Sequence, residues 1–533
     1  MKLPTLTELI DRSIAENHAR LALRNTRAIP GEEPEITYEA LGSLVHRLAV
    51  GLQELGVTVG DRVAILSRPR IRFAASVLAI FRLGAWVVPV DPTHTAEEIE
   101  VVLRHAGVRI ALTTHDLLDR VPHDVTAIDF DDRRQPTFSS VLRDGPQPAA
   151  AIDEDSVAVL AYTSGTTGDP KGVMLTHGNI AADLIHGTKV IPVYSDDVFL
   201  AIAPWHHILG LVACLILPLY GGALALYTDE YRRLADLMQT HGVSIFVGVP
   251  KLHHALYERL LAKVEASTVT RILHRVAPRV IGRGIKKRLT GGRLRFLVSG
   301  SAPLDPGVAM GFRRMGIGMM EGYGLTETSP VISLSDPFSR KSGSVGRPIP
   351  EVEARILDPW PDGVGELLIR GPIVMKGYYR NTQATEQAID PDGWFHTGDL
   401  ACLDETGEIF LKGRAKNVIV LESGKNVYPE ELEWEIGRIP HVEEVLVRYR
   451  ESDGAIEAIV YPNQERLQAD GMLKRAREHI WNEVRTRLER LAPYKRLRSI
   501  RQLVLTDRPF PKTSTLDIKR HLFRFEERKD ARP

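Results

Sequence analysis

The segment with the clearest chemical character covers residues 162–172, with the sequence YTSGTTGDPKG. Gly165, Gly168 and Gly172 let the backbone turn sharply and approach a ligand closely. Backbone N–H groups in such a loop suit phosphate oxygens, as do its four Ser/Thr hydroxyls, and Lys171 adds a positive charge. It is not a Walker loop, because no Gly-Lys-Ser/Thr follows four residues after a glycine. A polar surface loop of similar composition is the alternative interpretation.

Further motifs follow one another along nearly the whole chain. They are residues 36–41 (ITYEAL), 83–92 (LGAWVVPVDP), 204–207 (PWHH), 322–328 (GYGLTET), 365–379 (GELLIRGPIVMKGYY), 393–400 (GWFHTGDL), 413–420 (GRAKNVIV) and 492–495 (APYK). Together with the glycine-rich segment they resemble the adenylate-forming superfamily of acyl-CoA synthetases, peptide-synthetase adenylation domains and luciferases. Residues 291–306 (GGRLRFLVSGSAPLDP) resemble its bacterial medium- or long-chain fatty acid–CoA ligases.

The resemblance implies that ATP and Mg²⁺ activate a carboxylic acid as an acyl-adenylate, and that the acyl group then passes to CoA. A carboxylate is a poor acylating agent because its leaving group would be oxide. Attack on the α-phosphorus of ATP makes AMP the leaving group instead. Both reactants are negative, so positioned cations and hydrogen-bond donors must supply most of the catalysis.

The resemblance also assigns roles to individual residues at the nucleotide. Thr326 matches a phosphate-contacting hydroxyl, and Glu327 matches a carboxylate that holds Mg²⁺. Tyr323 would lie against the adenine, while Asp399 would accept hydrogen bonds from both ribose hydroxyls and Arg414 would contact the ribose. The ATP- or AMP-binding residues expected are Thr163, Ser164, Gly165, Thr166, Thr167, Gly168, Gly300, Ser301, Ala302, Gly322, Tyr323, Gly324, Thr326, Asp399 and Arg414.

Other roles concern the acid, CoA and the motion between the two half-reactions. His207 matches a histidine beside the acyl tunnel, and Lys416 matches the hinge of a mobile lid. The loop that approaches the pantetheine arm of CoA corresponds to Ser423, Gly424 and Lys425. The catalytic set expected is Lys171, His207, Thr326, Glu327 and the residue at position 517. The histidines show no metal-ligand spacing such as HExxH, so no zinc is expected.

The chain departs from the family's pattern at residues 511–520 (PKTSTLDIKR). The family's lysine that bridges the acid and the α-phosphate falls here on Asp517. A pair of unit charges about 4 Å apart at an effective dielectric near 20 is worth ~4 kcal/mol, so the exchange replaces attraction by repulsion. We therefore expect Asp517 to slow adenylation by orders of magnitude while thioester formation from acyl-AMP is relatively spared.

Three alternatives remain open on these residues. The chain could be an acyl-AMP ligase that loads a carrier protein, although no carrier domain is fused to it. It could also bind acyl-adenylate or ATP without catalysis, which Asp517 makes worth testing. The acid could be aryl rather than fatty. Gly324 favours a chain, since acetate-specific relatives carry a bulky Trp there and Gly would leave the pocket open.

Strand-like and helix-like segments alternate over the first 400 or so residues, as in 61–66 (DRVAIL), 85–90 (AWVVPV) and 156–162 (SVAVLAY). This pattern predicts an α/β fold with mostly parallel sheets. We expect a large N-terminal domain of several subdomains over residues 1–412, which holds ATP and the acid. A smaller α+β lid should cover 413–533, with helices at 429–438 and around 472–491.

Composition limits the partners and the compartment. Lys plus Arg number 68 and Asp plus Glu 68, so no nucleic-acid partner is expected. Cys214 and Cys402 are the only cysteines, and no signal peptide is evident, which fits a cytoplasmic enzyme. Residues 208–227 lack charges, but Pro218 and the adjacent glycines favour a buried helix, a turn and a strand over a membrane span.

One basic stretch suggests contact with a membrane surface. Residues 271–295 contain nine Lys/Arg and no acidic residue, with apolar residues between the arginines. Such a face could rest on an anionic membrane, as a peripheral contact through which fatty acids arrive. A solvated helix face is the commoner explanation.

Overall fold

The computed structural model describes residues 2–163, 170–421, 425–450, 453–512 and 518–523. The chain divides into two compact units, which are described separately. The large unit comprises Met1–Arg355, Leu368–His396 and Asp404–Ile409. The small unit comprises Ile356–Leu367, Thr397–Leu403 and Phe410–Pro533. The domain boundary expected at residue 413 lies inside a strand, Ile409–Arg414, and stays a prediction.

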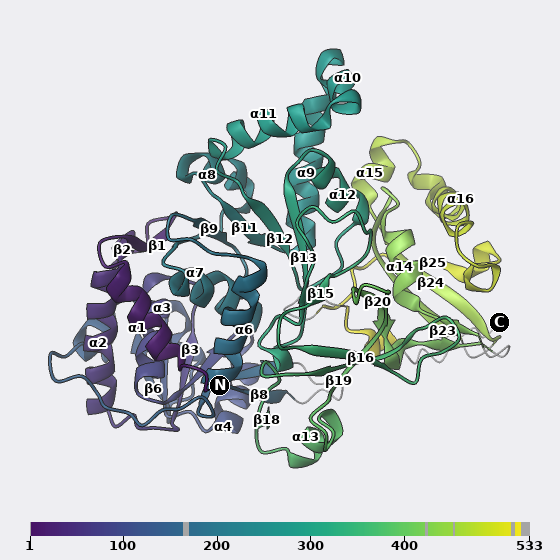
Figure 1. The fold of residues 1–533 in the computed structure, drawn as a ribbon. Coiled ribbons are helices and arrows are strands. Elements are labelled where there is room, and N and C mark those ends of the chain that lie inside the picture. Colours follow the sequence, from purple (N-terminus) through teal and green to yellow (C-terminus); the bar gives the residue numbers. More distant parts are fainter. Residues whose placement is uncertain (1, 164–169, 422–424, 451–452, 513–517, 524–533) are drawn as a thin grey trace. The chain divides into compact units, whose positions relative to one another are not determined.

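A seven-stranded sheet occupies one side of the large unit (Figure 1). Five of its strands are parallel and mostly apolar, as strands covered on both faces are. A hairpin partner runs antiparallel to them, and a short edge strand pairs antiparallel with that partner. In spatial order the strands are β18 (Gly377–Tyr378), β8 (Lys171–Thr176), β7 (Val157–Thr163), β4 (Trp86–Val90), β3 (Arg62–Leu66), β5 (Ile110–Thr113) and β6 (Thr126–Asp129).

A nine-stranded sheet forms the second layer of the large unit. Its six central strands are parallel, and the three at its two ends are antiparallel. In spatial order they are β15 (Arg347–Pro348), β14 (Ser333–Leu334), β13 (Gly318–Tyr323), β12 (Phe296–Ser299), β11 (Ile245–Gly248), β9 (Val198–Ala201), β10 (Leu224–Tyr227), β1 (Leu21–Asn25) and β2 (Glu35–Thr37).

Helix α3 (Ile71–Arg82) is buried along its whole length and contacts strands of both large sheets. Most of its residues are apolar, and its two arginines find partners inside the protein: Arg72 donates to the Phe130 carbonyl and Arg82 pairs with Asp11. Several other helices begin at Thr caps whose hydroxyls accept a backbone N–H, as Thr5 does for α1 and Thr95 for α4. The Thr-capped helices are α1 (Leu6–Glu16), α2 (Tyr38–Glu54), α4 (Ala96–Ala106), α5 (Phe138–Val141) and α6 (His177–Val190). The large unit also contains α7 (Leu217–Tyr220), α8 (Leu234–His241), α12 (Pro306–Arg314) and α13 (Thr382–Ala388).

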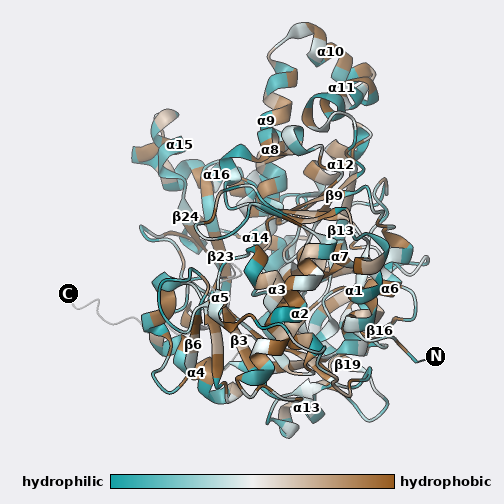
Figure 2. Cartoon of the chain, turned by 90° about the vertical axis from the view of Figure 1, so that its left-hand side faces the viewer, coloured by the Kyte–Doolittle hydropathy of each residue, from teal (hydrophilic) through white to brown (hydrophobic). Residues whose placement is uncertain are grey.

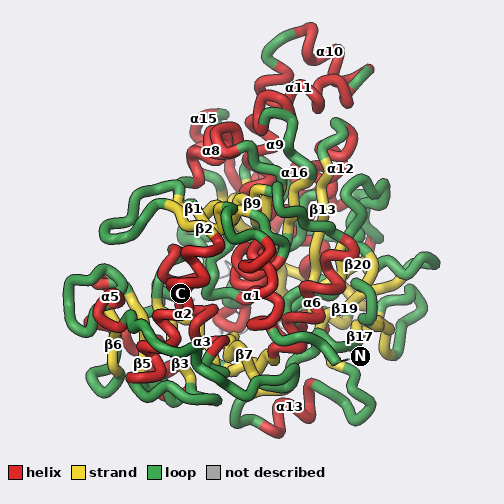
Figure 3. The backbone as a smooth tube through the Cα atoms, turned by 60° about the vertical axis from the view of Figure 1, so that its left-hand side comes forward, coloured by secondary structure: helices red, strands yellow, loops and turns green. Residues whose placement is uncertain are grey.

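Helices α9 (Pro250–Glu265), α10 (Thr268–Val276) and α11 (Pro278–Thr290) extend away from the sheets of the large unit (Figures 1 and 3). The spacing of Leu252, Ala255, Leu256 and Leu260 predicts one core face on α9. Ala255 is exposed, however, and His253 is buried instead. Helix α10 buries none of its residues. Figure 2 shows hydrophobic and hydrophilic residues mixed along α10 and α11.

A four-stranded sheet contains β16 (Glu353–Leu357), β17 (Gly365–Arg370), β19 (Phe395–Leu403) and β20 (Ile409–Arg414), and its strands supply residues to both units. The rest of the small unit has a core of α14 (Pro429–Gly437) and α16 (Ala476–Leu488) against a three-stranded sheet. That sheet contains β23 (Val442–Arg450), β24 (Ala455–Pro462) and β25 (Leu503–Leu505); the remaining elements are α15 (Gln464–Ala469), β21 (Ile419–Val420) and β22 (Asn426–Val427).

The α/β fold predicted from the alternating pattern is confirmed, with its large multi-sheet N-terminal region and small C-terminal sheets. The uncharged segment 208–227 forms a buried π-helical stretch (Gly210–Ile216), α7, a turn and β10. Within the described residues, the helices are too short or too polar for any of them to span a bilayer.

Candidate functional site

Two candidate segments lie at the same edge of the nine-stranded sheet. Strands β12 and β13 are parallel neighbours, with Ser299 opposite Glu321. Residues 300–302 follow the first strand, and Tyr323 ends the second. Carboxyl ends of adjacent parallel strands are where open α/β sheets bind ligands. The fold therefore places the residues assigned to the adenine and to the phosphates side by side.

The glycine-rich segment connects two antiparallel strands. Thr163, the last residue of β7, lies opposite Lys171, the first residue of β8. Ser164, Gly165, Thr166, Thr167 and Gly168 lie outside the described residues. The sequence predicts a helix that begins near Thr176, and α6 does begin at His177, capped by the Thr176 hydroxyl. Strand β8 lies between the glycine-rich segment and this helix, and it holds Lys171.

Tyr378 brings Lys171 and Glu327 into one arrangement. The Tyr378 hydroxyl donates to Glu327 Oε1 over 2.9 Å, and Lys171 Nζ lies 5.1 Å from the centre of the Tyr378 ring. Strand β18, which contains Tyr378, pairs with β8, so the phenol is fixed beside the hairpin. Burial and the negative charge of Glu327 raise the pKa of Tyr378 above its usual value, which keeps the phenol a donor.

The carboxylate oxygens of Glu327 are suitable ligands for a magnesium ion. Glu327 lies in a 3₁₀ turn, Thr326–Thr328, and its carbonyl oxygen accepts from Met375 N over 2.9 Å. One carboxylate oxygen accepts from Tyr378, and two such oxygens together offer about four lone-pair sites. Mg²⁺ in nucleotide sites is commonly held by one or two carboxylates and the substrate phosphates. Glu327 would supply that carboxylate, with Thr326 next to it.

Gly324 has a second explanation besides an open acyl pocket. A Cβ built on Gly324 would lie 1.8 Å from the carbonyl oxygen of Pro330 and 3.0 Å from the backbone nitrogen of Ile332. Any side chain would therefore collide with the backbone of residues 330–332. Close packing of this turn is enough to account for the glycine, so the open acyl pocket inferred from Gly324 stays a prediction.

His207 belongs to a group with His206 and Asp91. The two imidazole rings are 4.3 Å apart between centroids, and His206 Nε2 lies 3.4 Å from Asp91 Oδ2. Burial and the neighbouring His206 lower the pKa of His207 to about 4, so the ring is neutral near pH 7. Burial opposes ionisation of Asp91, but contacts with His206 and Thr93 outweigh it and lower the Asp91 pKa. A neutral His207 can donate to or accept from a substrate carboxylate or thiol.

The small unit pairs Asp399 with Arg414, the two residues assigned to the ribose. Arg414 Nε lies 2.9 Å from Asp399 Oδ1, and Arg414 Nη1 donates to the carbonyl of Thr397 over 3.2 Å. Asp399 is 7% exposed, and its backbone N–H donates to the Thr397 hydroxyl. Thr397 in turn donates to the carbonyl of Leu367 over 2.7 Å. These contacts fix the Asp399 carboxylate on β19, and its Oδ1 contacts the guanidinium of Arg414.

Other candidates of the small unit occupy its surface. Lys416 is exposed in a 3₁₀ turn, Ala415–Asn417, directly after β20. Lys425 Nζ lies 4.7 Å from the centre of the Tyr494 ring. Ser423, Gly424 and Asp517 lie outside the described residues, so their assignments stay predictions.

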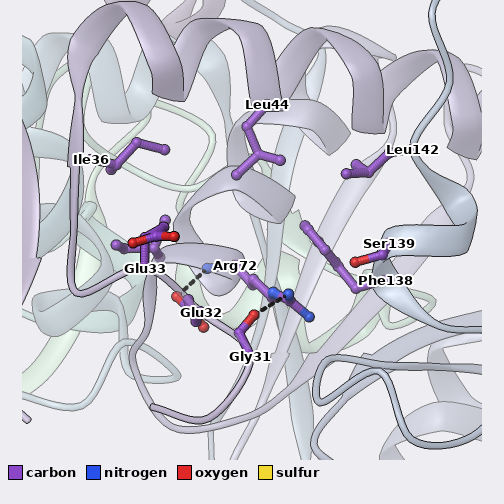
Figure 4. Close-up of a pocket in the computed structure, with 10 residues that line it drawn as sticks. Gly31, Glu32, Glu33, Ile36, Leu44, Arg72, Phe138, Ser139 and Leu142 are labelled. Atoms are coloured by element: carbon purple, nitrogen blue, oxygen red, sulfur yellow. Dashed lines mark hydrogen bonds between the residues drawn. The ribbon is translucent and has the colours of Figure 1, made fainter. Parts of the chain in front are cut away.

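A cavity of about 450 Å³ in the large unit has none of these candidates in its wall (Figure 4). Its lining comes from residues 31–33, from α2, α3 and α5, and from their neighbours. Glu32 pairs with Arg70 over 2.6 Å, and Arg72 pairs with Asp132 over 2.8 Å. Because these charges are compensated within the protein, we do not assign the cavity to the nucleotide or the acid.

Sequence reasoning did not single out three residues that organise the site. Tyr378 and Asp91 both lie inside recognised motifs, 365–379 and 83–92, which was the available signal. Asp183 had no such signal. It is buried on α6 and accepts from the backbone N–H of Val331 over 3.0 Å, which supports the turn after Gly324.

Comparisons with known proteins place this geometry among nucleotide-dependent ligases. A family model described as AMP-binding enzyme matches residues 10–379. Long-chain-fatty-acid–CoA ligase FadD15 of Mycobacterium bovis is 31% identical over 475 residues, or 79% of this chain and 76% of that protein. 4-Coumarate–CoA ligase 3 of Oryza sativa subsp. japonica is 32% identical over 486 residues, or 86% and 82%. The structure of O-succinylbenzoate Coenzyme A Synthetase (MenE) from Bacillus subtilis with ATP and magnesium ion has a TM-score of 0.78 at 25% identity, covering 96% of this chain and 98% of that chain.

Proposed function

The chain belongs to the AMP-binding enzyme family, and on this premise we propose that it is an AMP-forming fatty acid–CoA ligase. The observation that carries the proposal is the arrangement of Lys171, Tyr378 and Glu327, which joins the glycine-rich hairpin to the 322–328 motif. A cation, a phenol donor and a carboxylate beside backbone N–H groups are what a polyphosphate with its counter-ion requires.

The reaction has two steps. In the first, a carboxylate oxygen of the acid attacks the α-phosphorus of ATP, and the bond to the β-phosphate oxygen breaks to release pyrophosphate. In the second, the CoA sulfur attacks the acyl carbon, the thiol proton is lost to a base, and AMP leaves. Mg²⁺ held at Glu327 would neutralise phosphate charge during the first step.

The protein's own residues account for much of what these steps need. Lys171 would attract the phosphates, and Thr326 would donate to them. Asp399 and Arg414 would hold the ribose by carboxylate and guanidinium contacts. Neutral His207 would orient the carboxylate of the acid without adding a charge that must later be neutralised.

The fatty-acid assignment is supported by the FadD15 relative and by residues 291–306. An aryl acid is the competing substrate, since the 4-coumarate relative is equally similar. A panel of saturated fatty acids and hydroxycinnamates, assayed for CoA-ester formation with the Asp517→Lys variant, decides between them. Preference for the aryl acids would refute the fatty-acid assignment, and absence of any CoA ester would refute the ligase itself.

A second candidate function is non-catalytic binding of acyl-adenylate, and the acidic Asp517 favours it. Preformed acyl-AMP supplied with CoA separates the two candidates. The ligase converts it to the CoA ester, whereas a binding protein holds a non-hydrolysable acyl-AMP mimic and forms no ester.

A further inference from the structure

A histidine-rich cluster in the small unit contains none of the residues assigned to the reaction. His479 and Glu483 are one turn apart on α16, and His441 immediately precedes β23. His441 Nδ1 lies 3.0 Å from Glu483 Oε2 and 3.2 Å from His479 Nε2. His479 Nε2 and Glu483 Oε2 are 3.9 Å apart. Two imidazole nitrogens and a carboxylate oxygen thus form a small triangle.

The size of this triangle suits a tetrahedral metal ion. Zinc binds histidine nitrogen at about 2.0–2.1 Å and carboxylate oxygen at about 2.0–2.2 Å, which separates tetrahedral ligand atoms by about 3.3 Å. The three separations here bracket that value. We propose that His441 Nδ1, His479 Nε2 and Glu483 Oε2 bind one zinc ion. Mixed nitrogen and oxygen ligands suit zinc better than magnesium or calcium.

Asp470 is a hydrogen-bond acceptor for the second ring nitrogen of His441, as carboxylates commonly are for metal-binding histidines. Its Oδ2 lies 2.8 Å from His441 Nε2, on the opposite side of the ring from the triangle. A carboxylate there accepts the Nε2 proton, which fixes the tautomer that turns the Nδ1 lone pair toward the metal. The His441 side chain is 9% exposed, so its position is set by the surrounding packing.

The alternative to a bound metal is a doubly protonated His441 that donates to Asp470 and Glu483, and the titration described below separates the two. His441 Nδ1 carries one proton or one lone pair, yet it faces both a carboxylate oxygen and a second imidazole nitrogen. A bound cation satisfies all three atoms at once. The side chains of His479 and Glu483 are 27% and 33% exposed, so zinc can enter from solvent and keep a water in its fourth position.

Zinc binding would connect α16 to the start of β23, a connection that the spacing of histidines in the sequence does not predict. His441 and His479 are far apart along the chain, and a local spacing rule such as HExxH therefore misses them. A group in the large unit, Asp91 with His206 and His207, also has the right atom types. This group belongs to the candidate acyl site, and the test includes it as the other place where zinc could bind.

The test uses the full chain, freed of metal with a chelator and dialysed. We expect isothermal titration with zinc chloride to give one site, and zinc to raise the thermal midpoint. His479→Gln and Glu483→Gln should each weaken zinc binding at least tenfold. Both residues are partly exposed, so these variants should fold, and circular dichroism checks this.

The matched control is a pair with the same spacing on α9. His254 Nε2 and Glu258 Oε1 are 3.2 Å apart but lack a third ligand, so His254→Gln should bind zinc like the parent chain. Cobalt(II) gives an independent measurement through the visible absorption of its tetrahedral complexes. Unchanged zinc affinity in both α16 variants would overturn the proposal. Loss of binding in His206→Gln, with the α16 variants unaffected, would also overturn it.

Discussion

The hydroxyl of Tyr378 donates to Glu327 Oε1 over 2.9 Å, which connects the edge strand β18 to the turn that carries the proposed magnesium ligand. This relationship makes Tyr378 a positioning residue for Glu327. It restricts the carboxylate to one orientation and leaves its remaining lone pairs for a cation.

Tyr378→Phe should therefore weaken magnesium dependence without removing the ligand itself. A hydrogen bond to a charged group contributes about 1.5–3 kcal/mol, so the magnesium concentration for half-maximal adenylation should rise about tenfold or more. Pyrophosphate release at varied Mg²⁺ measures this. Tyr379→Phe is the matched control, since that ring packs edge-on against Trp86. Equal magnesium dependence in the parent chain and Tyr378→Phe would rule out the role.

Asp399→Asn should reduce the affinity for ATP. Asparagine cannot accept from both ribose hydroxyls as a carboxylate can, and it also loses the ion pair with Arg414. We expect the KM for ATP to rise about tenfold or more, in keeping with the loss of a charge-assisted hydrogen bond. Arg370→Gln tests specificity, because its exposed pair with Glu353 lies in the same four-stranded sheet. A similar rise in that variant would point to a general effect on the sheet.

Asp517→Lys should act on one half-reaction. Restoring a positive charge replaces repulsion of the α-phosphate by attraction, so adenylation should rise by orders of magnitude. Conversion of supplied acyl-AMP and CoA to the thioester should change little, because the resemblance places this loop away from the second step. Pyrophosphate release and thioester formation are measured separately. Equal adenylation rates with Asp and Lys would refute a role for position 517.

The sequence was sufficient for the fold class and supplied the segments of the candidate site, for a physical reason. Strands such as 61–66 and 85–90 are buried on both faces and read as apolar runs, and Glu327 and Asp399 lie in short polar motifs. What it missed depends on packing contacts that the pattern of residue types does not reveal. His253 is buried on α9 although Ala255 seemed to mark the core face, and a side chain at Gly324 would meet a carbonyl six residues away.

The buried His253 predicts a loss of stability in mild acid. Its Nε2 lies 2.9 Å from the Val298 carbonyl, and burial lowers its pKa from 6.5 to about 4. Between these values the unfolded chain binds a proton that the folded chain does not, so stability falls as pH drops from above 6.5 toward 4. At pH 5 the expected cost is about 2 kcal/mol for this one residue. His253→Gln, which cannot titrate, should lose less stability between pH 7 and pH 5.

Denaturant unfolding at both pH values checks this. His177 and His207 also have pKa values lowered to about 4 by burial, so the variant should keep part of the dependence. His254→Gln, an exposed neighbour on α9, is the control and should behave like the parent chain. An unchanged slope in His253→Gln would show that its protonation does not contribute.

Helix α10 contains the start of the basic stretch 271–295 and exposes apolar residues beside its arginines. Val269, Ile272 and Val276 are 73%, 56% and 75% exposed, and they recur at the spacing of one helical face. Arg271 and Arg275 lie on the same short helix, and no acidic residue occurs between 271 and 295. An exposed apolar face beside arginines complements an anionic lipid surface, where apolar groups leave water and phosphates meet guanidinium groups.

We therefore expect the chain to sediment with vesicles of phosphatidylcholine and phosphatidylglycerol but weakly with phosphatidylcholine alone. Added salt should weaken binding, because it screens the arginines. Ile272→Glu should abolish most of the binding, since it places a negative charge in the apolar face. Val101→Glu is the control, because Val101 is 51% exposed on α4, a helix with three glutamates whose single arginine, Arg104, is paired with Glu100. Equal binding by both variants, or none by the parent chain to either vesicle, would show that α10 is an ordinary solvated helix.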